Sequence, residues 1–150
     1  MQIGIAIVEH QQRYLVGVRG PNIAMAGYDE FPGGKCLVNE SPSACAIREC
    51  LEETGLRVRI DRLLDQQEIE TSRGLLKLHF FLCHPVEVTQ VQEQQAEFRW
   101  VSAVQLQGLR FPEANLDVVH MLTSDWNPTQ SIPSKSLPSP ESRGQESPGD

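Results

Sequence analysis

The chain has 150 residues, of which 39% are hydrophobic and 22% charged, and its net charge is -7. This length predicts one domain with a real core, and the acidic balance argues against nucleic-acid polymers as the main partner, because such proteins carry a basic face. The sequence has no apolar run of about 18 residues for a membrane span, and MQIGIAIVEH lacks the features of a signal peptide, so we expect a cytoplasmic protein without membrane partners.

The N-terminal part of the chain predicts a hairpin followed by a glycine turn. Residues 2–8 (QIGIAIV) and 13–19 (RYLVGVR) flank the polar segment EHQQ, which is typical of two paired strands. A stretch of small and turn residues then leads to FPGGK at 31–35. Because glycine has no Cβ, such a turn lets the backbone approach a ligand closely.

Residues 42–54 predict a helix with clear signals at both ends. Ser41 can cap the helix, and Pro42 suits its first position. Gly55 is the expected C-terminal glycine. One face, which we expect to be buried, carries an apolar stripe at helical spacing: Ala44, Ile47 and Leu51.

The rest of the domain predicts further strands, two more helices and a tail. We expect strands at 58–64, 66–71, 75–84 and 98–101, with an extension of the sheet at 85–88. A polar loop lies at 91–97, and helices are expected at 103–109 and at 112–122, the second starting near Pro112. The domain is therefore expected to span residues 1–124.

Residues 125–150 are expected to be disordered. The segment from Asn127 onward contains five of the ten prolines and six serines, with almost no large apolar side chain. Such a composition cannot bury enough surface to offset its ordering entropy. A PxxP-like linear motif in this tail is the alternative, and removal of residues after Ser124 should leave the activity of the domain intact.

The helix at 42–54 gathers carboxylates where they repel one another. Glu49, Glu52 and Glu53 lie within one and a half turns, Glu40 precedes the helix, and Arg48 is the one cation among them. A solvated helix face is one interpretation. The other is a Mg²⁺ site, because hard divalent cations prefer carboxylate oxygens and can bridge an acidic protein to substrate phosphates. A nearby glutamate could then take a proton from an attacking water in phosphate anhydride hydrolysis.

The same stretch resembles the signature of the Nudix hydrolases, G, five residues, E, seven residues, R-E-U-x-E-E-x-G-U, where U is bulky and apolar. Nine positions match at the required spacing: Gly34, Glu40, Arg48, Glu49, Cys50, Glu52, Glu53, Gly55 and Leu56. Cys50 is smaller than the usual residue but compatible with burial. The resemblance implies an α/β fold, an α/β/α sandwich around a mixed β-sheet, with the signature forming a loop, a helix and a second loop.

The resemblance also implies roles for the signature residues. Mg²⁺, for which Mn²⁺ can substitute, would be held by side chains and one carbonyl group: Glu49, Glu52, Glu53 and the carbonyl of Gly33. Either Glu49 or Glu53 would be the general base. Arg48 would orient a catalytic glutamate, and Glu40 would brace the loop or contact a second ion.

Two further segments, FPGGK at 31–35 and FPEAN at 111–115, are similar to those of the MutT-like subgroup, the 8-oxo-dGTP diphosphatases. That likeness implies hydrolysis of 8-oxo-dGTP to 8-oxo-dGMP and pyrophosphate by a monomer. The implied substrate-binding residues are Arg19, Glu30, Phe31, Pro32, Gly33, Lys35 and Asn115. The Asn115 amide can pair with O6 and N7–H of oxidised guanine, although an asparagine here could instead cap or decorate the last helix.

The chain departs from the subgroup in two places. Ala24 stands where a phosphate-contacting histidine is expected, and Gln94 where a loop glutamate is expected, so either Glu93 or Glu97 replaces that glutamate or the site runs with fewer carboxylates. Another Nudix specificity, for CTP or a nucleoside diphosphate derivative, therefore stays open. So do a non-catalytic nucleotide-sensing module and an adaptor acting through the tail.

The remaining cysteines, histidines and tryptophans are interpreted as structural. No CxxC pair or zinc-finger spacing occurs among the cysteines, which we expect to be small buried residues in a reduced compartment: Cys36, Cys45, Cys50 and Cys83. The histidines are scattered and are expected to be structural or exposed: His10, His79, His84 and His120. Trp100 and Trp126 are expected to be packing residues.

Overall fold

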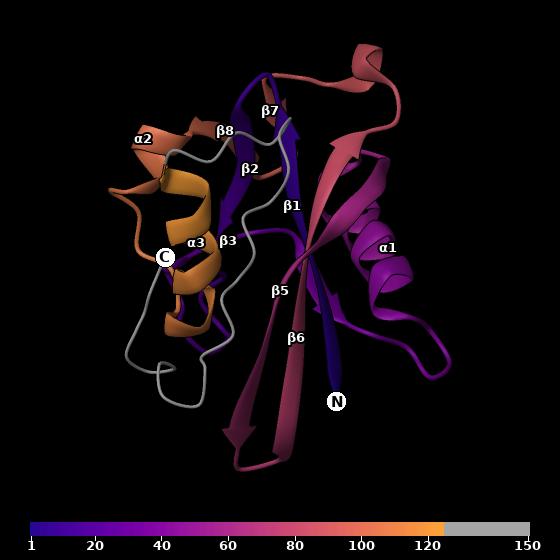
Figure 1. Ribbon diagram of the computed structural model, residues 1–150, viewed down its shortest axis with the longest axis vertical. Helices are drawn as coiled ribbons and strands as arrows, with labels where there is room; N and C mark the ends of the chain where they lie inside the picture. Colours follow the sequence, from indigo (N-terminus) through magenta and orange to yellow (C-terminus); the bar gives the residue numbers. More distant parts are fainter. Residues whose placement is uncertain (125–150) are drawn as a thin grey trace.

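The computed structural model describes residues 1–124, which form a β-sheet with helices on both faces (Figure 1). Residues 125–150, with the predicted tail and Trp126, lie outside the described part. The elements are β1 (Gln2–His10), β2 (Arg13–Val18), β3 (Asp29–Glu30), β4 (Gly33–Lys35), α1 (Pro42–Thr54), β5 (Val58–Thr71), β6 (Gly74–Pro85), η1 (Val88–Gln90), β7 (Gln94–Gln95), β8 (Phe98–Ser102), α2 (Ala103–Leu106), η2 (Glu113–Asn115) and α3 (Leu116–Thr123), where η marks a 3-10 helix.

The described sheet has eight strands and is mixed, as expected. The main order is β5-β6-β1-β2-β8-β7, while β3 pairs with β2 and β4 pairs with β1. β1 and β6 run parallel, with Ile3 opposite Leu78. The other pairs are antiparallel. The predicted hairpin of β1 and β2 is present, with Glu9 opposite Tyr14.

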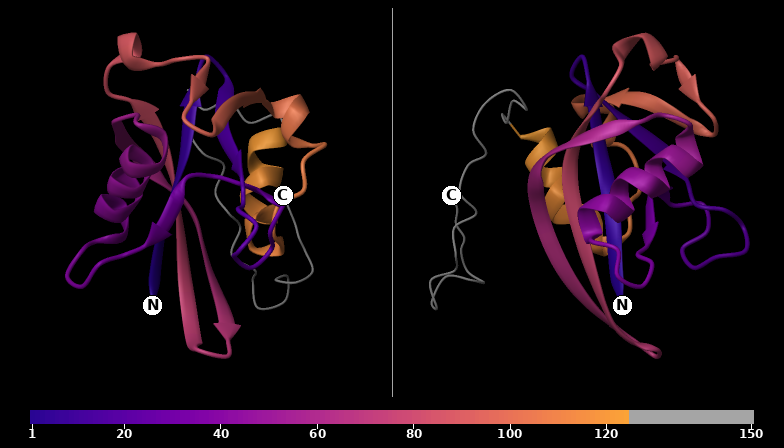
Figure 2. Two further views of the ribbon diagram at one scale, coloured as in Figure 1. Left: turned by 180° about the vertical axis from the view of Figure 1, so that it is seen from behind. Right: turned by 90° about the vertical axis from the view of Figure 1, so that its right-hand side faces the viewer.

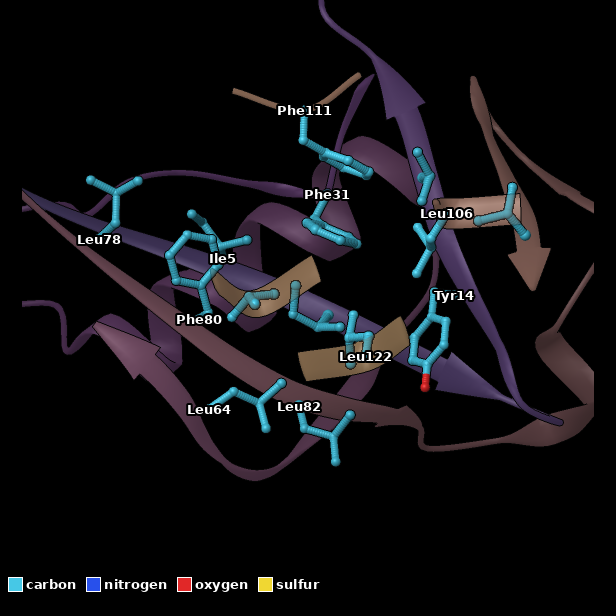
Figure 3. Packing of buried hydrophobic residues seen from close by; sticks show 14 residues of the cluster. Ile5, Tyr14, Phe31, Leu64, Leu78, Phe80, Leu82, Leu106, Phe111 and Leu122 are labelled. Carbon is cyan, nitrogen blue, oxygen red and sulfur yellow. The ribbon is translucent and has the colours of Figure 1, made fainter. Parts of the chain in front are cut away.

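Helices cover opposite faces of the sheet, which confirms the α/β/α sandwich. Figure 2 shows α1 on one side, with α2 and α3 on the other. Alternate residues of β1 serve the two layers, because successive side chains of a strand point to opposite faces. Ile5 and Ile7 belong to the core under α3, where Figure 3 shows Ile5 in one cluster with Leu122, whereas Ala6 and Val8 pack in the core under α1.

The predicted buried stripe of α1 was wrong at Ala44, whereas Ile47 does pack against the core under α1. Ala44 is exposed, while Ile47 and Leu51 are only half-buried. The buried residues of the helix are instead Cys45, Ala46, Cys50 and Thr54. The reason lies on the sheet, because α1 crosses β1 at Gly4, where an added Cβ would lie 2.8 Å from Ala46 N and 3.0 Å from Cys45 Cβ. A helix this close presents its small residues to the sheet.

Several predicted boundaries also needed correction. The two segments 58–64 and 66–71 are one strand, β5, which carries irregularities in its pairing with β6 between Ile60 and Arg62 and between Leu63 and Asp65. The segment 85–88 extends the sheet only at its first residue: β6 ends at Pro85, opposite Val58, Val86 N adds one bond to the carbonyl of Arg57 at 3.0 Å, and the chain then enters η1. The predicted helices 103–109 and 112–122 are shorter: α2 is Ala103–Leu106, and α3 begins only at Leu116, after a 3-10 turn.

The structural interpretation of the cysteines and of Trp100 is largely confirmed. Cys45, Cys50 and Cys83 are buried, whereas Cys36 is half-buried. Trp100 is buried and donates from Nε1 to the carbonyl of Gln92 at 2.8 Å. Within residues 1–124, no helix is long and apolar enough to cross a membrane.

His84 links two carboxylates at the end of the sheet. Its Nδ1 lies 3.1 Å from Glu9 Oε1 and its Nε2 lies 2.9 Å from Asp61 Oδ2. Both ring nitrogens can donate only when the imidazole is protonated. The bond with Glu9 is the main cause that raises the pKa of His84 above its usual value, against the opposing effect of burial.

This pairing predicts that the protein loses stability as the pH rises. A raised folded pKa means that the His84 contribution is complete below the unfolded pKa, about 6.5, and is lost as the pH rises through the folded value. We expect a loss of about 1 kcal/mol attributable to this residue. Urea unfolding of wild type and His84→Gln between pH 5.5 and 8.5 measures it. An equal pH dependence in the two proteins would contradict the assignment.

Candidate active site

The helix that carries the glutamates begins and ends where its caps predict. Ser41 Oγ accepts from Ala44 N at 3.1 Å, Pro42 occupies the first position, and Gly55 adopts φ 76° after the last turn. The cap N–H of Gly55 bonds to the carbonyl of Leu51, as in a left-handed helix terminus. The helix register, and with it the direction of each glutamate, is therefore fixed from both ends.

Two of the glutamates face β4 and one faces solvent. Glu53 Oε1 accepts from Gly33 N at 3.1 Å. One turn earlier, the Glu49 carboxylate lies directly over Gly34, where an added Cβ would be 2.6 Å from Oε2. The side chain of Glu52 is 58% exposed. Glu49 and Glu53 are thus held against the glycine strand, as their i, i+4 spacing requires.

The electrostatics single out Glu53. Burial raises its pKa to about 7, the Gly33 N–H opposes the rise, and the carboxylates of Glu49, Glu30 and Glu52 add to it. Glu30 belongs to β3, so acidic groups converge here from two elements. Burial also raises the pKa of Glu30, against the attraction of Arg19. A carboxyl group with a pKa near neutrality is suited to proton transfer.

Arg48 holds the acidic cluster together. Its Nε and Nη2 donate to the two oxygens of Glu40 at 2.7 and 2.9 Å, and its Nη1 donates to Glu49 at 3.1 Å and to Glu52 at 3.2 Å. The bonds from Arg48 and from the N–H of Leu37 lower the pKa of Glu40 to about 2. Nη2 also donates to the carbonyl of Lys35 at 3.1 Å. The bidentate pair of Arg48 and Glu40, together with the bond to Lys35, holds the loop between β4 and α1 against the helix.

The four predicted metal ligands are not assembled into one coordination group. Among residues 1–124, no three His, Cys, Asp or Glu side chains are grouped so that they could hold a metal ion. Arg48 binds Glu49 and Glu52, and Glu53 is turned to the N–H of Gly33. The chemistry of these side chains nevertheless fits a hard divalent cation, because several carboxylate oxygens converge here. The neighbouring carboxylates help to raise the pKa of Glu53, and a bound cation would lower that pKa again.

The two phenylalanine-proline segments lie side by side. The rings of Phe31 and Phe111 stack at 4.8 Å between centroids and 16° between planes (Figure 3). Both rings are in the core, and Pro32 is fully buried with its carbonyl accepting from Ala6 N at 2.8 Å, so neither the Phe31 nor the Pro32 side chain is open to a ligand. The stack packs the FPEAN segment against the residues directly before β4, the strand that faces Glu49 and Glu53.

The other predicted binding residues surround this region. Asn115 is half-buried, and its Nδ2 lies 3.4 Å from the carbonyl of Pro112, while within the described chain its side chain makes no capping bond to α3. Arg19 donates from Nε to the carbonyl of Ala24 at 2.8 Å and lies 3.4 Å from Glu30 Oε1. The Lys35 side chain is exposed. The roles of these residues remain predictions.

Comparison with known proteins identifies the family of the chain. The family model described as the NUDIX domain matches residues 1–122. The chain belongs to the Nudix hydrolase family. It is 29% identical over 123 residues to the 8-oxo-dGTP diphosphatase of Escherichia coli K12, covering 81% of this chain and 95% of that protein.

Two further proteins are similar to this chain, one in sequence and one in fold. The CTP pyrophosphohydrolase of Escherichia coli K12 is 29% identical over 119 residues, covering 79% of this chain and 86% of that protein. The crystal structure of the MutT protein from Methanosarcina mazei Go1 superimposes with a TM-score of 0.66 at 23% identity, covering 81% and 91% of the two chains, which shows the shared fold. This chain is thus a Nudix pyrophosphohydrolase of the MutT-like type.

The loop after β6 differs from the sequence expectation. Glu93 is 87% exposed and pairs with Arg13 at 3.4 Å. Arg13 is opposite His10 on β1, five positions from Ile5, the partner of Gly33, so about 17 Å of strand separates Arg13 from the level of Gly33. Glu97 is exposed, and Gln94 donates to the carbonyl of Ala96.

Gln95 is a residue that sequence reasoning missed. It is buried, and its Nε2 donates to the carbonyl of Thr54 at 3.1 Å, at the C-terminal end of the Nudix helix. Its Oε1 accepts from Gln92 N. A glutamine within a run of polar residues carries no signal that separates it from its exposed neighbours, so only the fold reveals this anchor.

Gly34→Ala should lower hydrolysis by a factor between about 10 and 100 and leave stability nearly unchanged. The new Cβ would collide with the end of the Glu49 side chain, which is flexible and can swing away. The measurements are kcat and the urea midpoint. Gly108→Ala, whose added Cβ would lie 3.7 Å from Gln105 O, is the control. An unchanged kcat in Gly34→Ala would show that the position of Glu49 is not needed.

Proposed function

We propose that this Nudix pyrophosphohydrolase hydrolyses 8-oxo-dGTP to 8-oxo-dGMP and pyrophosphate, and so removes an oxidised nucleotide from the pool used for DNA replication. The observation that carries the proposal is the Phe31–Phe111 stack, which packs the FPEAN segment, to which Asn115 belongs, against the FPGGK segment that contains β4. The similarity to the 8-oxo-dGTP diphosphatase of Escherichia coli over nearly its full length supports it.

The proposed cofactor is Mg²⁺, held by Glu49, Glu52, Glu53 and the carbonyl of Gly33, with Mn²⁺ able to substitute. When bound, the ion neutralises phosphate charge and makes a bound water more acidic. Its binding requires Arg48 to share or release Glu49 and Glu52, both of which it now contacts. Arg48 would keep its bidentate grip on Glu40, which preserves the loop geometry.

The proton of the attacking water would pass to a glutamate. Glu53 is our first choice as general base, because its carboxylate is partly buried and is held in place by the N–H of Gly33 at 3.1 Å. Glu49 is the alternative. Water attacks a phosphorus of the triphosphate, its proton goes to the carboxylate, and pyrophosphate leaves. Positioning and charge neutralisation supply most of the rate in such a reaction.

The base would be read by Asn115. Its amide can accept from N7–H and donate to O6 of 8-oxoguanine, whereas ordinary guanine presents N7 as an acceptor. The amide group is weakly engaged, since its Nδ2 lies 3.4 Å from the carbonyl of Pro112. It could therefore turn toward a nucleotide with little loss.

The first test is a panel of substrates with Mg²⁺: 8-oxo-dGTP, dGTP, CTP and a nucleoside diphosphate sugar. We expect the highest kcat/KM with 8-oxo-dGTP. Equal or better turnover of CTP would favour the second candidate, a CTP pyrophosphohydrolase, which the equally similar Escherichia coli enzyme suggests.

Asn115→Ala should lower kcat/KM for 8-oxo-dGTP by about 10- to 100-fold, since an unmatched hydrogen-bonding edge costs about 1–3 kcal/mol, and should change dGTP hydrolysis much less. The control is Glu113→Ala, an exposed neighbour in the same 3-10 turn. A uniform loss for both nucleotides would assign Asn115 to the structure of the turn and not to base recognition.

A further inference from the structure

Two cysteines occupy facing positions on the loop and the helix of the Nudix motif. Gly34 of β4 lies against Glu49 of α1. Cys36 follows Gly34 by two residues on the same side of the strand, and Cys45 precedes Glu49 by one helical turn on the same side of the helix. Two strand residues and one helical turn each advance about 6 Å. The geometry therefore brings Cys36 to Cys45.

The hydrogen bonds around the two cysteines agree with this placement. Cys45 Sγ donates to the carbonyl of Gly34 at 3.3 Å, and the N–H of Cys36 donates to the carbonyl of Gln2 at 2.9 Å, which continues the β1–β4 ladder. Burial raises the pKa of Cys45 to about 12, and a hydrogen bond with the Cys36 thiol raises it further. The two thiols are direct neighbours.

The two sulfurs differ in access. Cys36 is half-buried and so reaches solvent, while Cys45 is buried behind it. The other two cysteines, Cys50 and Cys83, both lie in the core between α1 and the sheet. A small oxidant in solution therefore meets Cys36 first.

We propose that Cys36 and Cys45 form a reversible intramolecular disulfide when the protein meets a peroxide. Hydrogen peroxide oxidises the Cys36 thiol to a sulfenic acid and is itself reduced to water. The Cys45 sulfur then attacks the Cys36 sulfur, the S–O bond breaks, and a second water leaves with the Cys45 proton. In sum, two thiols and one peroxide give one disulfide and two waters.

The bond would change the Nudix loop directly. Formation of the disulfide removes the Cys45 S–H that now donates to the carbonyl of Gly34, the residue that faces Glu49. It also ties the segment after β4 to the first half of α1, beside the Arg48 Nη2 that contacts both Lys35 O and Cys45 Sγ. The inference concerns these thiols alone and does not depend on which nucleotide is the substrate.

The experiment uses the full chain, reduced and then exposed to hydrogen peroxide without reductant. Remaining thiols are alkylated under denaturing conditions, and digests are analysed by mass spectrometry. We expect two of the four thiols to be lost together, a linked Cys36–Cys45 peptide two hydrogens lighter than its parts, and full reversal by dithiothreitol. Cys83→Ser should form the same bond, and Cys36→Ser should form none.

Three results would overturn the inference. They are four free thiols after peroxide, a bond that joins Cys36 to a cysteine other than Cys45, and accumulation of Cys36 sulfinic acid with Cys45 still free. Cys45→Ala provides a second variant that leaves Cys36 in place. It should trap the sulfenic acid, which dimedone labels, and absence of that label would also count against the mechanism.

Discussion

Glu53→Gln should abolish most of the hydrolysis, with a loss on the order of 10²- to 10⁴-fold, and at the same time make the metal-free protein more stable at pH 8. The loss follows because glutamine cannot accept the proton of the attacking water and is a poorer ligand for a hard cation. Retention of more than a tenth of the wild-type kcat would rule out Glu53 as the general base and leave Glu49.

The gain in stability follows from the burial of the carboxylate. The folded pKa of about 7 lies above the usual value, so between pH 4.5 and 7 the folded state binds more protons than the unfolded state. The free energy of unfolding therefore falls as the pH rises through this window. Glutamine removes the buried charge and can still accept the bond from Gly33 N. We expect a gain of about 1 kcal/mol, below the roughly 3 kcal/mol that the shift allows.

Urea unfolding with a chelator present, at pH 5 and pH 8, measures this effect. The difference between wild type and Glu53→Gln should appear at pH 8 and shrink at pH 5. Glu52→Gln is the matched control, because this side chain is 58% exposed and its charge is paired with Arg48 at 3.2 Å. A Glu53→Gln protein that is less stable than wild type at pH 8 would contradict the argument. A sensor module would show no hydrolysis in any of these proteins.

Gly4→Ala should destabilise the fold by at least about 2 kcal/mol. An added Cβ would collide with the carbonyl oxygen of Pro42 and lie 2.8 Å from Ala46 N, both backbone atoms of α1 that cannot swing away. The helix would have to lift from β1, which also moves the glutamates. Denaturant unfolding and far-ultraviolet circular dichroism measure the outcome.

Gly34→Ala is the informative comparison for Gly4→Ala. Both glycines face α1, but Gly34 meets a flexible carboxylate and Gly4 meets helix backbone. The first change should therefore act on catalysis and the second on stability, with Gly108→Ala neutral in both measurements. Near-native stability of Gly4→Ala would show that α1 does not rest on β1 as closely as the structure places it.

Much of the Nudix helix was predictable because its signals act over short distances. Ser41, Pro42 and Gly55 each satisfy or terminate backbone bonds within one turn, so the helix bounds could be derived locally. The spacing of Glu49 and Glu53 then required them to share a face. The roles of Arg48 and Glu40 were predicted from the family resemblance. The structure adds that Arg48 donates two hydrogen bonds to the Glu40 carboxylate.

Where prediction failed, the deciding contact came from a distant part of the chain. The expected stripe of Ala44, Ile47 and Leu51 was the most apolar face of the helix, yet Gly4, some forty positions earlier, selects the small face by letting the backbones touch. Gln95 binds the carbonyl of Thr54 from across the domain. Neither contact leaves a periodic or compositional trace.

By itself, the sequence determined the family, the sandwich of helices on a mixed sheet, the bounds of the Nudix helix and the crowding of its carboxylates, because these depend on neighbours in the chain or on a spaced motif. Only the tertiary structure decided which face of α1 is buried, which glutamate is desolvated and where Glu93 and Gln95 point. Those outcomes depend on how closely two backbones can approach and on which charges are brought together in space, and chain order does not record either.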